Sequence, residues 1–554
     1  MPSVTQTAKR PTKTTGLHYW MTQVLEQCDR VSAEFGADAV HDLRVALRRC
    51  RSIADGLRAI DPNAEWKAMK KAGKQLFQSL GELRDIQVML EWIEKLEPAR
   101  SGAGKSVEKT NSTTAEVSSP SHQEPSNAED FGDSSHPRVA EEHDSAAESL
   151  RRILAEREKE QKRAARKSLD EFDRKQWRQW AKSLPSRAAH VRPGSGVFKH
   201  LALERWTQAR ALHSPALHNR SQIALHTLRI AIKRFRYIVE NFLPAEHRAW
   251  SKDLKEIQDA LGEVHDLDVL WTTALSCHVF PDETSRKGWH ARILQERNKR
   301  ITRYREKMIG PQSLWQVWRA GLPQGKQIPA LAMRRMKLWA RVLDPDFAHS
   351  ERVAKLALEL YDGLTHAGFF ASGRADSGIS TSTNGDGARS SLQIAALLHD
   401  VGKSKGDKGH HKASLDLIQE HGAPVGWKAA DVNRAAVVAR FHCGALPARS
   451  HKTLRDLLPD EQKVTIQLAA ILRLANALDA RHDGHIRKVS IEKPSVGNHR
   501  GAGSGCVVVD AEGFSPRSQV ARTAASERYL LETVLRRPIM IKAMKSPGFR
   551  RTSS

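Results

Sequence analysis

Long apolar runs, paired cysteines and tyrosines are scarce in this chain of 554 residues. No run approaches the roughly 18 apolar residues that a membrane span needs, and the first residues lack the apolar core of a signal peptide. The five cysteines are scattered and form no CxxC pair, which argues against a disulfide framework or a zinc ribbon. We therefore expect a cytoplasmic protein in a reducing setting, without a membrane partner.

Acidic side chains are outnumbered over the chain as a whole. The 89 Lys and Arg residues exceed the 64 Asp and Glu residues, which gives a formal net charge of +25 and a pI near 10.0. This excess favours polyanionic partners. Residues 101–150 run against the trend, with ten acidic and three basic side chains, eleven serines and almost no aliphatic periodicity. We expect this acidic segment to be disordered.

Helical periodicity dominates the rest of the sequence. The predicted helices are His41–Ile60, Trp66–Glu94, Ser149–Lys182, Leu225–Phe242, Trp250–Leu275, Phe347–Leu364, Ser391–Gly402, Ser414–Glu420 and Thr465–Ala480. Gly-rich and polar stretches, Ala371–Ser391 and Pro494–Gly505, predict surface loops. Strand patterns appear only after Asp483, at Ile486–Glu492 and Cys506–Asp510, followed by a helix over Ala525–Leu535 and an apolar run, Pro538–Ile541. The sequence predicts a mainly α protein with a small α+β appendage.

An internal repeat organises the first half of the chain. The segment HDLRVALRRCRS from His41 returns as HTLRIAIKRFRY from His226, and LGELRDIQVML from Leu80 returns as LGEVHDLDVLW from Leu261. The two spacings, 185 and 181 residues, nearly agree. Two related units are therefore expected, with the acidic segment between them.

Each repeat carries a helix with one apolar and one cationic face. Such a face is usually a solvated surface, but here the cations have almost no acidic partners at helical spacing, and the pattern recurs. Arginine forks and lysine ammonium groups in a row suit a chain of phosphates. The candidate phosphate ligands are His41, Arg44, Arg48, Arg51, Lys71 and Lys74 in the first copy, and His226, Arg229, Lys233, Arg236, Lys252 and Lys255 in the second.

These paired motifs resemble the CHAD domain, the conserved-histidine α-helical domain, over about residues 15–310, with the acidic insert at about 98–148 and a disordered N-terminus, 1–14. The resemblance implies a pseudo-twofold pair of four-helix bundles whose basic groove binds inorganic polyphosphate. The second copy departs from the first in having Thr227 in place of Asp42 and His265 in place of Arg84. Neither change removes the basic strip.

The second half carries an ordered set of histidines and aspartates. His399 and Asp400 end an apolar helix, His349 opens another, and Asp479 closes a third. Imidazole and carboxylate groups from separate helices are what a hydrolytic divalent metal needs. Single members of such a set are more often capping or core residues, but the order makes chance less plausible. The further candidates are His410, His411 and His442.

The segments HSERVAKLALEL, AALLHDVGK, HHKASLDLI, ARFHCGALP and LAAILRLANALDARH resemble the HD superfamily of metal-dependent phosphohydrolases. More narrowly, they resemble the C-terminal HD region of the exopolyphosphatase and guanosine pentaphosphate phosphatase family, over about residues 315–545. The resemblance implies an all-α HD-type domain at 315–485, a small α+β appendage at 486–545 and a tail at 546–554. That family's actin-like ATPase-type domain is missing, and the CHAD-like region stands in its place.

By this resemblance His349, His399, Asp400 and Asp479 hold a first metal, with His410, His411 and His442 as candidates for a second. The metal is a divalent ion, Mn, Mg or Fe, and the catalytic candidates are His399, Asp400 and Lys403. Lys403 could equally be a surface lysine. Arg440 and Arg473 could bind phosphate or pair with buried carboxylates, and for Arg473 we favour the structural role.

Three functions remain open from the sequence. The first is a cytoplasmic protein that binds polyphosphate and hydrolyses a phosphate ester or anhydride, either polyphosphate or a nucleotide. The second is a non-enzymatic adaptor of polyphosphate granules with a regulatory HD module, and the third is a nucleic-acid-binding protein of little specificity. The third would use tryptophans as a stacking surface, although core packing explains their spacing more simply: Trp177, Trp180, Trp315, Trp318 and Trp339. The acidic insert could compete with polyphosphate, or simply link two bundles.

Overall fold

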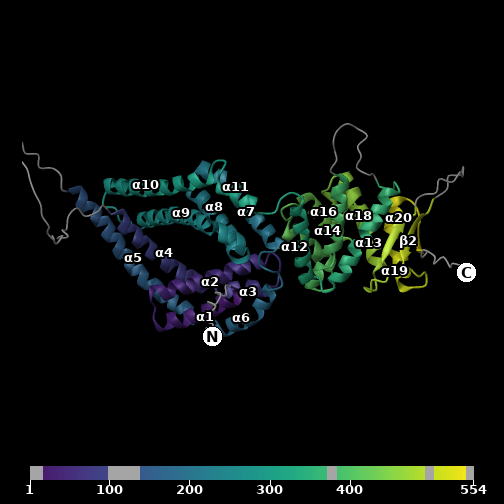
Figure 1. Ribbon diagram of the computed structural model, residues 1–554, viewed down its shortest axis with the longest axis horizontal. Coiled ribbons are helices and arrows are strands. Elements are labelled where there is room, and N and C mark those ends of the chain that lie inside the picture. Colours follow the sequence, from purple (N-terminus) through teal and green to yellow (C-terminus); the bar gives the residue numbers. More distant parts are fainter. Residues whose placement is uncertain (1–15, 98–137, 371–383, 493–504, 545–554) are drawn as a thin grey trace, which may run out of the picture. The chain divides into compact units, whose positions relative to one another are not determined.

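The computed structural model describes residues 16–97, 138–370, 384–492 and 505–544 (Figure 1). The described residues form 20 α-helices, one 3-10 helix and three strands, which confirms the mainly α fold class. The chain divides into two compact units. Unit 1 is Met1–Ser52, Ala68–Arg187 and Arg205–Gly321, and unit 2 is Ile53–Lys67, Ala188–Glu204 and Leu322–Ser554. None of the described helices is long and apolar enough to cross a membrane.

Eleven of the described helices precede Leu322. They are α1 (Leu17–Ala33), α2 (Ala37–Leu57), α3 (Ala64–Ala72), α4 (Lys74–Leu96), α5 (Arg138–Asp170), α6 (Arg174–Ala188), α7 (Gly196–Asn219), α8 (Gln222–Phe242), α9 (Pro244–Ser276), α10 (Glu283–Met308) and α11 (Leu314–Ala320). The last turn of α2, the start of α3 and the start of α7 belong to unit 2.

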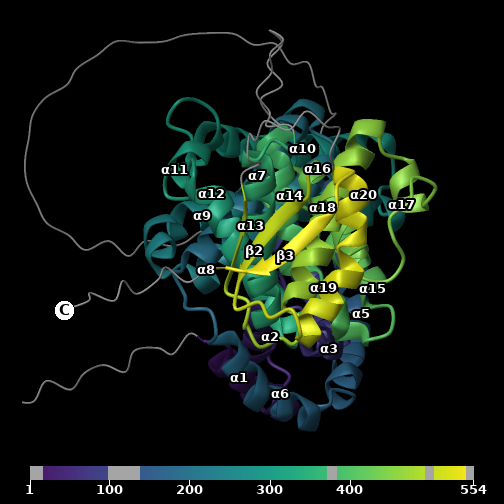
Figure 2. The ribbon, with the colours of Figure 1, turned by 90° about the vertical axis from the view of Figure 1, so that its right-hand side faces the viewer.

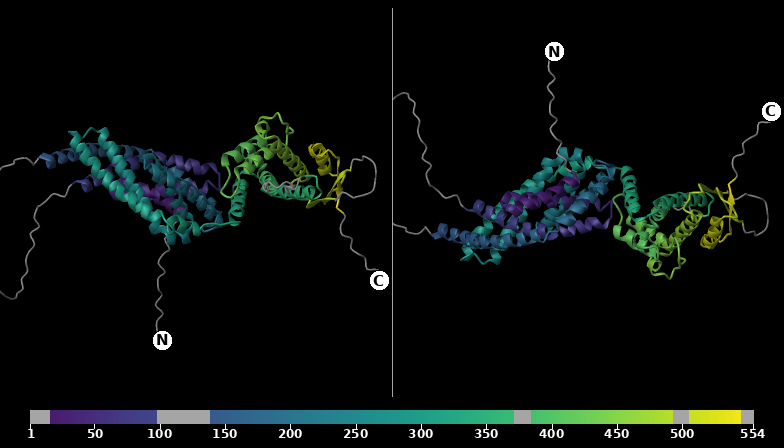
Figure 3. Two further views of the ribbon diagram at one scale, coloured as in Figure 1. Left: turned by 90° about the horizontal axis from the view of Figure 1, so that it is seen from above. Right: turned by 90° about the horizontal axis from the view of Figure 1, so that it is seen from below.

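The sequence repeat reappears as matching helices in unit 1. Helices α2 and α8 each contain 21 residues, and His41 and His226 occupy the fifth position of each. A shared apolar core joins α4 and α5 to α9 and α10, with Trp92 and Trp289 among its buried side chains. Figure 3 shows the long helices of this unit lying side by side. Both copies therefore contribute to one packed body.

The tryptophans considered as a stacking surface are all buried. Their exposed fractions are 0% for Trp177, 8% for Trp180, 2% for Trp315, 0% for Trp318 and 5% for Trp339. Indole rings that water cannot reach are not available to stack on bases. These tryptophans belong to the core and do not support nucleic-acid binding.

The remaining helices and all three strands belong to unit 2. They are α12 (Gln327–Leu343), α13 (Phe347–His366), α14 (Asn384–Leu398), the 3-10 helix η1 (Val401–Lys405), α15 (His410–His421), α16 (Ala429–Arg440), α17 (Lys452–Arg455), α18 (Pro459–Leu478), β1 (Lys488–Ile491), β2 (Val507–Glu512), α19 (Gln519–Glu527), α20 (Tyr529–Leu535) and β3 (Ile539–Ala543). Helix α18 is buried almost all round, from Leu468 to Ala475, and so forms the centre of this unit.

A three-stranded sheet with the order β1-β2-β3 forms the α+β appendage. Strand β1 pairs antiparallel with β2, placing Ser490 opposite Asp510, and β2 pairs parallel with β3, placing Val509 opposite Ile541. Figure 2 shows β2 and β3 beside α19 and α20. Buried Val489, Val507, Val509 and Ile539 join the core of unit 2.

Several helix boundaries differ from those predicted. The predicted helix Trp66–Glu94 is interrupted at Gly73, Ser149–Lys182 is interrupted after Asp170, and Ala525–Leu535 is interrupted at Arg528. Helix α5 already begins at Arg138, so residues 138–148 of the predicted disordered insert are helical. Likewise α14 begins at Asn384, inside the predicted loop Ala371–Ser391. In both places the helix end is polar in composition, so periodicity alone predicts disorder or a loop there. Four predicted segments lie wholly or mostly outside the described residues: the N-terminus 1–14, the acidic insert, the loop Pro494–Gly505 and the tail 546–554.

Candidate phosphate site and metal centre

The two predicted basic strips, one from each repeat, meet in unit 1. Lys233 on α8 is half-buried. Its burial, together with the charges of Arg229 on the same helix and of Arg48 and Arg44 on α2, lowers the pKa of Lys233 to about 8. Cations that are far apart in the sequence therefore share one site. Arg44, Arg48, Arg229 and Lys233 are called the basic cluster below.

Aspartates of the two LGExxD motifs lie beside the basic cluster. Asp85 of α4 interacts with Lys233 and Arg44, and Asp266 of α9 interacts with Arg229. Burial raises the pKa of Asp266 to about 6; Arg229 opposes this rise and Asp85 adds to it. The four cations outnumber these two carboxylates, so the motif offsets only part of the positive charge.

Two of the predicted phosphate ligands are oriented by protein contacts. Arg44 donates to the carbonyl of Leu80 at 3.2 Å, and its guanidinium lies 5.6 Å from the centre of the Phe77 ring. Arg51 donates to the carbonyl of Lys70 at 2.8 Å and lies 4.9 Å from the same ring centre. One aromatic side chain thus holds two guanidinium groups of the strip in place.

The other predicted phosphate ligands differ in exposure. Lys71, Lys74, Lys252, Lys255 and His41 are exposed, whereas Arg236 and His226 are half-buried. His226 Nδ1 lies 3.3 Å from His265 Nδ1. Burial, with Arg229 nearby, lowers the pKa of both histidines, that of His265 to about 4. At pH 7 this histidine pair is therefore neutral and adds no charge to the phosphate site.

Three imidazole rings converge on the Asp400 carboxylate in unit 2. His399 follows α14, His410 opens α15 and His442 follows α16. Their Nε2 atoms lie 3.4, 3.4 and 3.5 Å from Asp400 oxygens. The Nδ1 atoms lie 2.8, 2.8 and 2.7 Å from the carbonyl oxygens of Ala396, Asp407 and Ala439 respectively. A carbonyl can only accept, so each Nδ1 carries a proton and each ring turns its Nε2 toward Asp400, the orientation that metal-binding histidines have.

The residues present fit a metal ion. Two groups of side chains bring their ligand atoms within 4.8 Å of one another, His349 with His399 and Asp400, and His410 with His442 and Cys443. His399 Nε2 is buried and has no hydrogen-bond partner among the described residues. A buried nitrogen without a partner is costly, and a cation would satisfy it.

The surrounding side chains keep the Asp400 carboxylate in its charged form. Burial alone would raise the pKa of Asp400, but His399, His442 and the bound Lys403 outweigh burial and lower it far below its usual range. Lys403 donates to Asp400 Oδ2 at 2.6 Å. Burial lowers the pKa of His442 well below its usual value, whereas Asp400 outweighs burial at His399 and raises the pKa of that ring. The carboxylate is therefore ionised at any ordinary pH.

Asp479 is close to the centre but is already paired. Its Oδ2 accepts from His349 Nδ1 at 2.7 Å and from Arg352 at 2.8 Å, and its Oδ1 accepts from the backbone of Gly484 at 3.1 Å. The His349 and His399 rings lie 5.4 Å apart. The groups that could hold a metal among the described residues do not contain Asp479. Asp479 contacts His349 directly, and its role as a metal ligand stays a prediction.

The remaining candidates differ in their surroundings. The ring of His411 lies 5.7 Å from that of His410 at right angles to it, outside both metal-binding groups. Arg473 is buried and donates to Glu527 at 2.8 Å, in agreement with the structural role we favoured. The Arg440 guanidinium lies 5.3 Å from the centre of the Phe441 ring.

Sequence reasoning missed four residues near the centre. Cys443 lies 3.7 Å from His410 Nε2, and Asn476 lies 2.9 Å from His349 Nε2. His482 stacks on His349 at 3.8 Å, while Arg352 pairs with Asp479. The Cys beside His442 was a visible signal, because a His-Cys pair offers two metal ligands. The other three carry no comparable signal.

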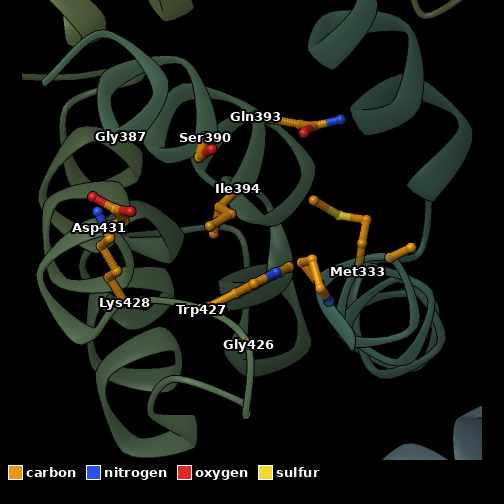
Figure 4. A pocket seen from close by; sticks show the side chains of 11 residues that line it. Met333, Gly387, Ser390, Gln393, Ile394, Gly426, Trp427, Lys428 and Asp431 are labelled. Atoms are coloured by element: carbon orange, nitrogen blue, oxygen red, sulfur yellow. The ribbon is translucent and has the colours of Figure 1, made fainter. Parts of the chain in front are cut away.

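A cavity of about 420 Å3 lies elsewhere in unit 2 (Figure 4). Met333 of α12, Ile394 of α14 and Trp427 give it an apolar side, while Lys428 and Asp431 are polar members of its wall. None of the residues of the metal-binding groups lines this cavity. It is therefore a separate feature from the centre.

Comparison with known families agrees with the division of features along the chain. Residues 21–275 match the CHAD domain family, and residues 333–500 match the family described as Ppx/GppA phosphatase, domain III. No curated protein matches the chain. These matches confirm the resemblances to the CHAD domain and to the C-terminal region of the exopolyphosphatase and guanosine pentaphosphate phosphatase family, whereas the HD superfamily stays a prediction. They suggest ligands related to polyphosphate or nucleotides.

Proposed function

We propose that the chain binds inorganic polyphosphate at the basic cluster and hydrolyses a phosphate ester or anhydride at the metal centre of unit 2. In this proposal residues 15–310 form the polyphosphate-binding domain, 315–485 an HD-type catalytic domain and 486–545 its appendage. The observation that carries the catalytic part is the convergence of three histidine Nε2 atoms on the Asp400 carboxylate.

Polyphosphate binding is supported by the physical state of the basic cluster. Partial burial and the charges of three nearby arginines lower the pKa of Lys233, so a neighbouring anion would stabilise its charged form. Exposed lysines from both copies, such as Lys74 and Lys255, extend the positive charge to the surface. Arginines supply paired contacts to phosphate oxygens and lysines supply point charges.

The chemistry at the centre follows from the side chains that surround it. His349, His399 and Asp400 would hold one divalent ion, which would polarise the phosphoryl group and lower the pKa of a bound water. The carbonyls behind His399, His410 and His442 fix the tautomer of each ring. Lys403 orients the Asp400 carboxylate through their hydrogen bond. Arg352 keeps His349 in place through Asp479, and Asn476 does so by direct contact.

A non-enzymatic adaptor of polyphosphate granules remains the second candidate. The observation that favours it is that two carboxylates of the centre already have cationic partners, Asp400 with Lys403 and Asp479 with Arg352. In such an adaptor the centre would bind metal or nucleotide without turnover. In either case five free cysteines suit a reducing compartment such as the cytoplasm.

Phosphate release from long-chain polyphosphate tests the catalytic part. The Mn²⁺-loaded wild type is compared with the double variant His399→Ala, Asp400→Ala, and with Asp416→Ala, an exposed aspartate on α15, as the control. We expect release by the wild type and by the control only. Release by none of the three, with metal still bound, would leave the adaptor; equal release by all three would exclude this centre as the site of hydrolysis.

Binding is tested separately with labelled polyphosphate at about 150 mM salt. Lys233→Ala removes a cation of the basic cluster, and Arg234→Ala removes an exposed cation from the next position on α8. Both variants lower the net charge by one, so a nonspecific electrostatic effect would weaken both equally. We expect Lys233→Ala to bind clearly more weakly than Arg234→Ala. Equal affinities would place the polyphosphate elsewhere.

A further inference from the structure

The cavity of about 420 Å3 in unit 2 has an apolar end and a polar end (Figure 4). Met333 of α12, Ile394 of α14 and Trp427 point toward one space at the apolar end. Lys428 and Asp431 lie at the other end, where α16 begins. Small-molecule sites are typically concave, mostly apolar and about 300–1,000 Å3 in volume, with a few polar groups that fix the orientation of the ligand. The cavity has this size and this kind of lining.

The loop that leads into Trp427 is anchored by the surrounding protein. His200 of α7 is fully buried, and its Nε2 donates to the carbonyl of Val425 at 2.8 Å. Gly426 has a φ of +96°, and a Cβ there would lie 2.6 Å from Ile328 Cγ2 at the start of α12. The backbone before Trp427 is therefore held at two points. A preorganised site loses less conformational entropy when a ligand binds.

Trp427 and Gln393 offer recognition groups that the protein itself does not use. Both side chains are half-buried, and neither the indole N–H of Trp427 nor the amide of Gln393 has a hydrogen-bond partner among the described residues. A tryptophan ring can stack on a nucleobase, and a glutamine amide can pair with the donor and the acceptor on one edge of adenine. The thioether of Met333 makes favourable contacts with aromatic rings. The apolar end therefore suits an adenine base.

The polar end suits the ribose and the phosphates of a nucleotide. Asp431 Oδ1 accepts from Arg434 at 3.3 Å and lies against α14, where a Cβ at Gly387 would be 2.9 Å from it. A carboxylate placed in this way can accept hydrogen bonds from ribose hydroxyls. Lys428 is exposed, and α16 begins directly after it without a side-chain cap. A lysine ammonium and the first amide groups of a helix both attract phosphate.

We propose that this cavity binds an adenine nucleotide, with the base on Trp427, the ribose at Asp431 and the phosphates at Lys428. The site is separate from the metal centre, because none of the residues of the metal-binding groups lines the cavity. Binding here requires neither polyphosphate nor a metal ion, so it goes beyond the proposed function and does not depend on it.

Calorimetric titration of the full-length protein with ADP tests the site. The buffer contains EDTA, so that no divalent ion links the nucleotide to the metal centre. We expect saturable binding by the wild type, about tenfold or more weaker binding by Trp427→Ala because base stacking is lost, and a smaller loss in Trp427→Phe. The control Trp271→Ala removes a half-buried tryptophan of unit 1 and should bind ADP like the wild type.

Adenosine separates the contribution of the base from that of the phosphates. Lys428→Ala should weaken ADP binding a few-fold and leave adenosine binding unchanged, whereas Lys463→Ala, at an exposed lysine of α18, should change neither. No ADP binding by the wild type, or equal ADP affinity in the wild type and Trp427→Ala, would overturn the site. An equal loss of ADP and adenosine affinity in Lys428→Ala would overturn the position of the phosphates. Intact ADP binding by a protein that releases no phosphate from polyphosphate would refute the proposed hydrolysis alone.

Discussion

Polyphosphate binding should weaken about tenfold between pH 7 and pH 9 because of Lys233 alone. Its pKa of about 8 lies midway between the two values. The ammonium is then about nine-tenths protonated at pH 7 and about one-tenth protonated at pH 9. If polyphosphate binds only the charged form, the apparent Kd rises about tenfold, equivalent to about 1.4 kcal/mol. The charged groups that act on Lys233 are Arg229, Arg48, Arg44 and Asp85, and its ammonium lies 5.8 Å from the centre of the Tyr237 ring.

A higher pH weakens polyphosphate binding through Lys233 but raises the contribution of Lys233 to folding stability. Deprotonation and unfolding, the two possible causes of weaker binding at high pH, can therefore be told apart. Folding lowers the pKa of Lys233 from 10.5 to about 8, so between these values the unfolded chain holds more protons. The contribution of Lys233 to stability therefore increases as the pH rises through this window. If deprotonation of Lys233 causes the weaker binding at pH 9, Lys233 should cause no loss of folding stability there. A thermal melt at each pH checks this.

The assay is anisotropy of labelled polyphosphate at constant ionic strength and at pH 7, 8 and 9. Lys233→Arg keeps its charge at all three values and should show no step. Arg234→Lys introduces an exposed lysine at the neighbouring position and should keep the wild-type step. A wild-type affinity that is constant from pH 7 to pH 9, or an equal step in Lys233→Arg, would refute the reasoning.

Three further predictions concern glycines and the metal. A Cβ at Gly81 would lie 2.8 Å from the Arg44 guanidinium, whereas a Cβ at Gly262, the counterpart in the second copy, would meet open space. We therefore expect Gly81→Ala to weaken polyphosphate binding a few-fold and Gly262→Ala to leave it unchanged. A Cβ at Gly402 would lie 2.0 Å from the carbonyl of His410, so Gly402→Ala should displace the start of α15 and weaken metal binding in calorimetry more than tenfold, although every ligand remains. Chelation should stop phosphate release while polyphosphate affinity stays unchanged; an equal loss of both would contradict separate sites.

The helical fold was predictable because apolar side chains recur with helical period throughout both halves. The repeat also indicated that His41 and His226 occupy equivalent helices, and they do. Helix boundaries were less predictable. At Gly73 and Arg528 one helix ends and the next begins, although backbone hydrogen bonds of helical spacing continue, from Gly73 N–H to Met69 O at 3.2 Å and from Arg528 N–H to Ala524 O at 3.0 Å. Such boundaries depend on small changes of backbone geometry, which local periodicity does not record.

The candidate sites were predictable to a different degree. His399, His410 and His442 could be singled out as chemically suitable residues, but their convergence on one carboxylate depends on where three helices end. The charges of Arg44 and Arg48 act on Lys233 across the two repeats, and no local sequence pattern records this proximity. Cys443 was visible beside His442 but is a small, half-buried side chain whose role depends on distances alone.

The two proposed sites solve opposite electrostatic problems. At the centre of unit 2 three imidazoles surround Asp400, whose single charge is already met by Lys403. In the proposed function a bound metal ion supplies the positive charge for the phosphoryl group. The basic cluster needs no such ion, because its arginines and Lys233 outnumber the nearby aspartates. Capture of a polyanion and cleavage of its phosphate bonds therefore depend on different sources of charge, and each can be removed without the other.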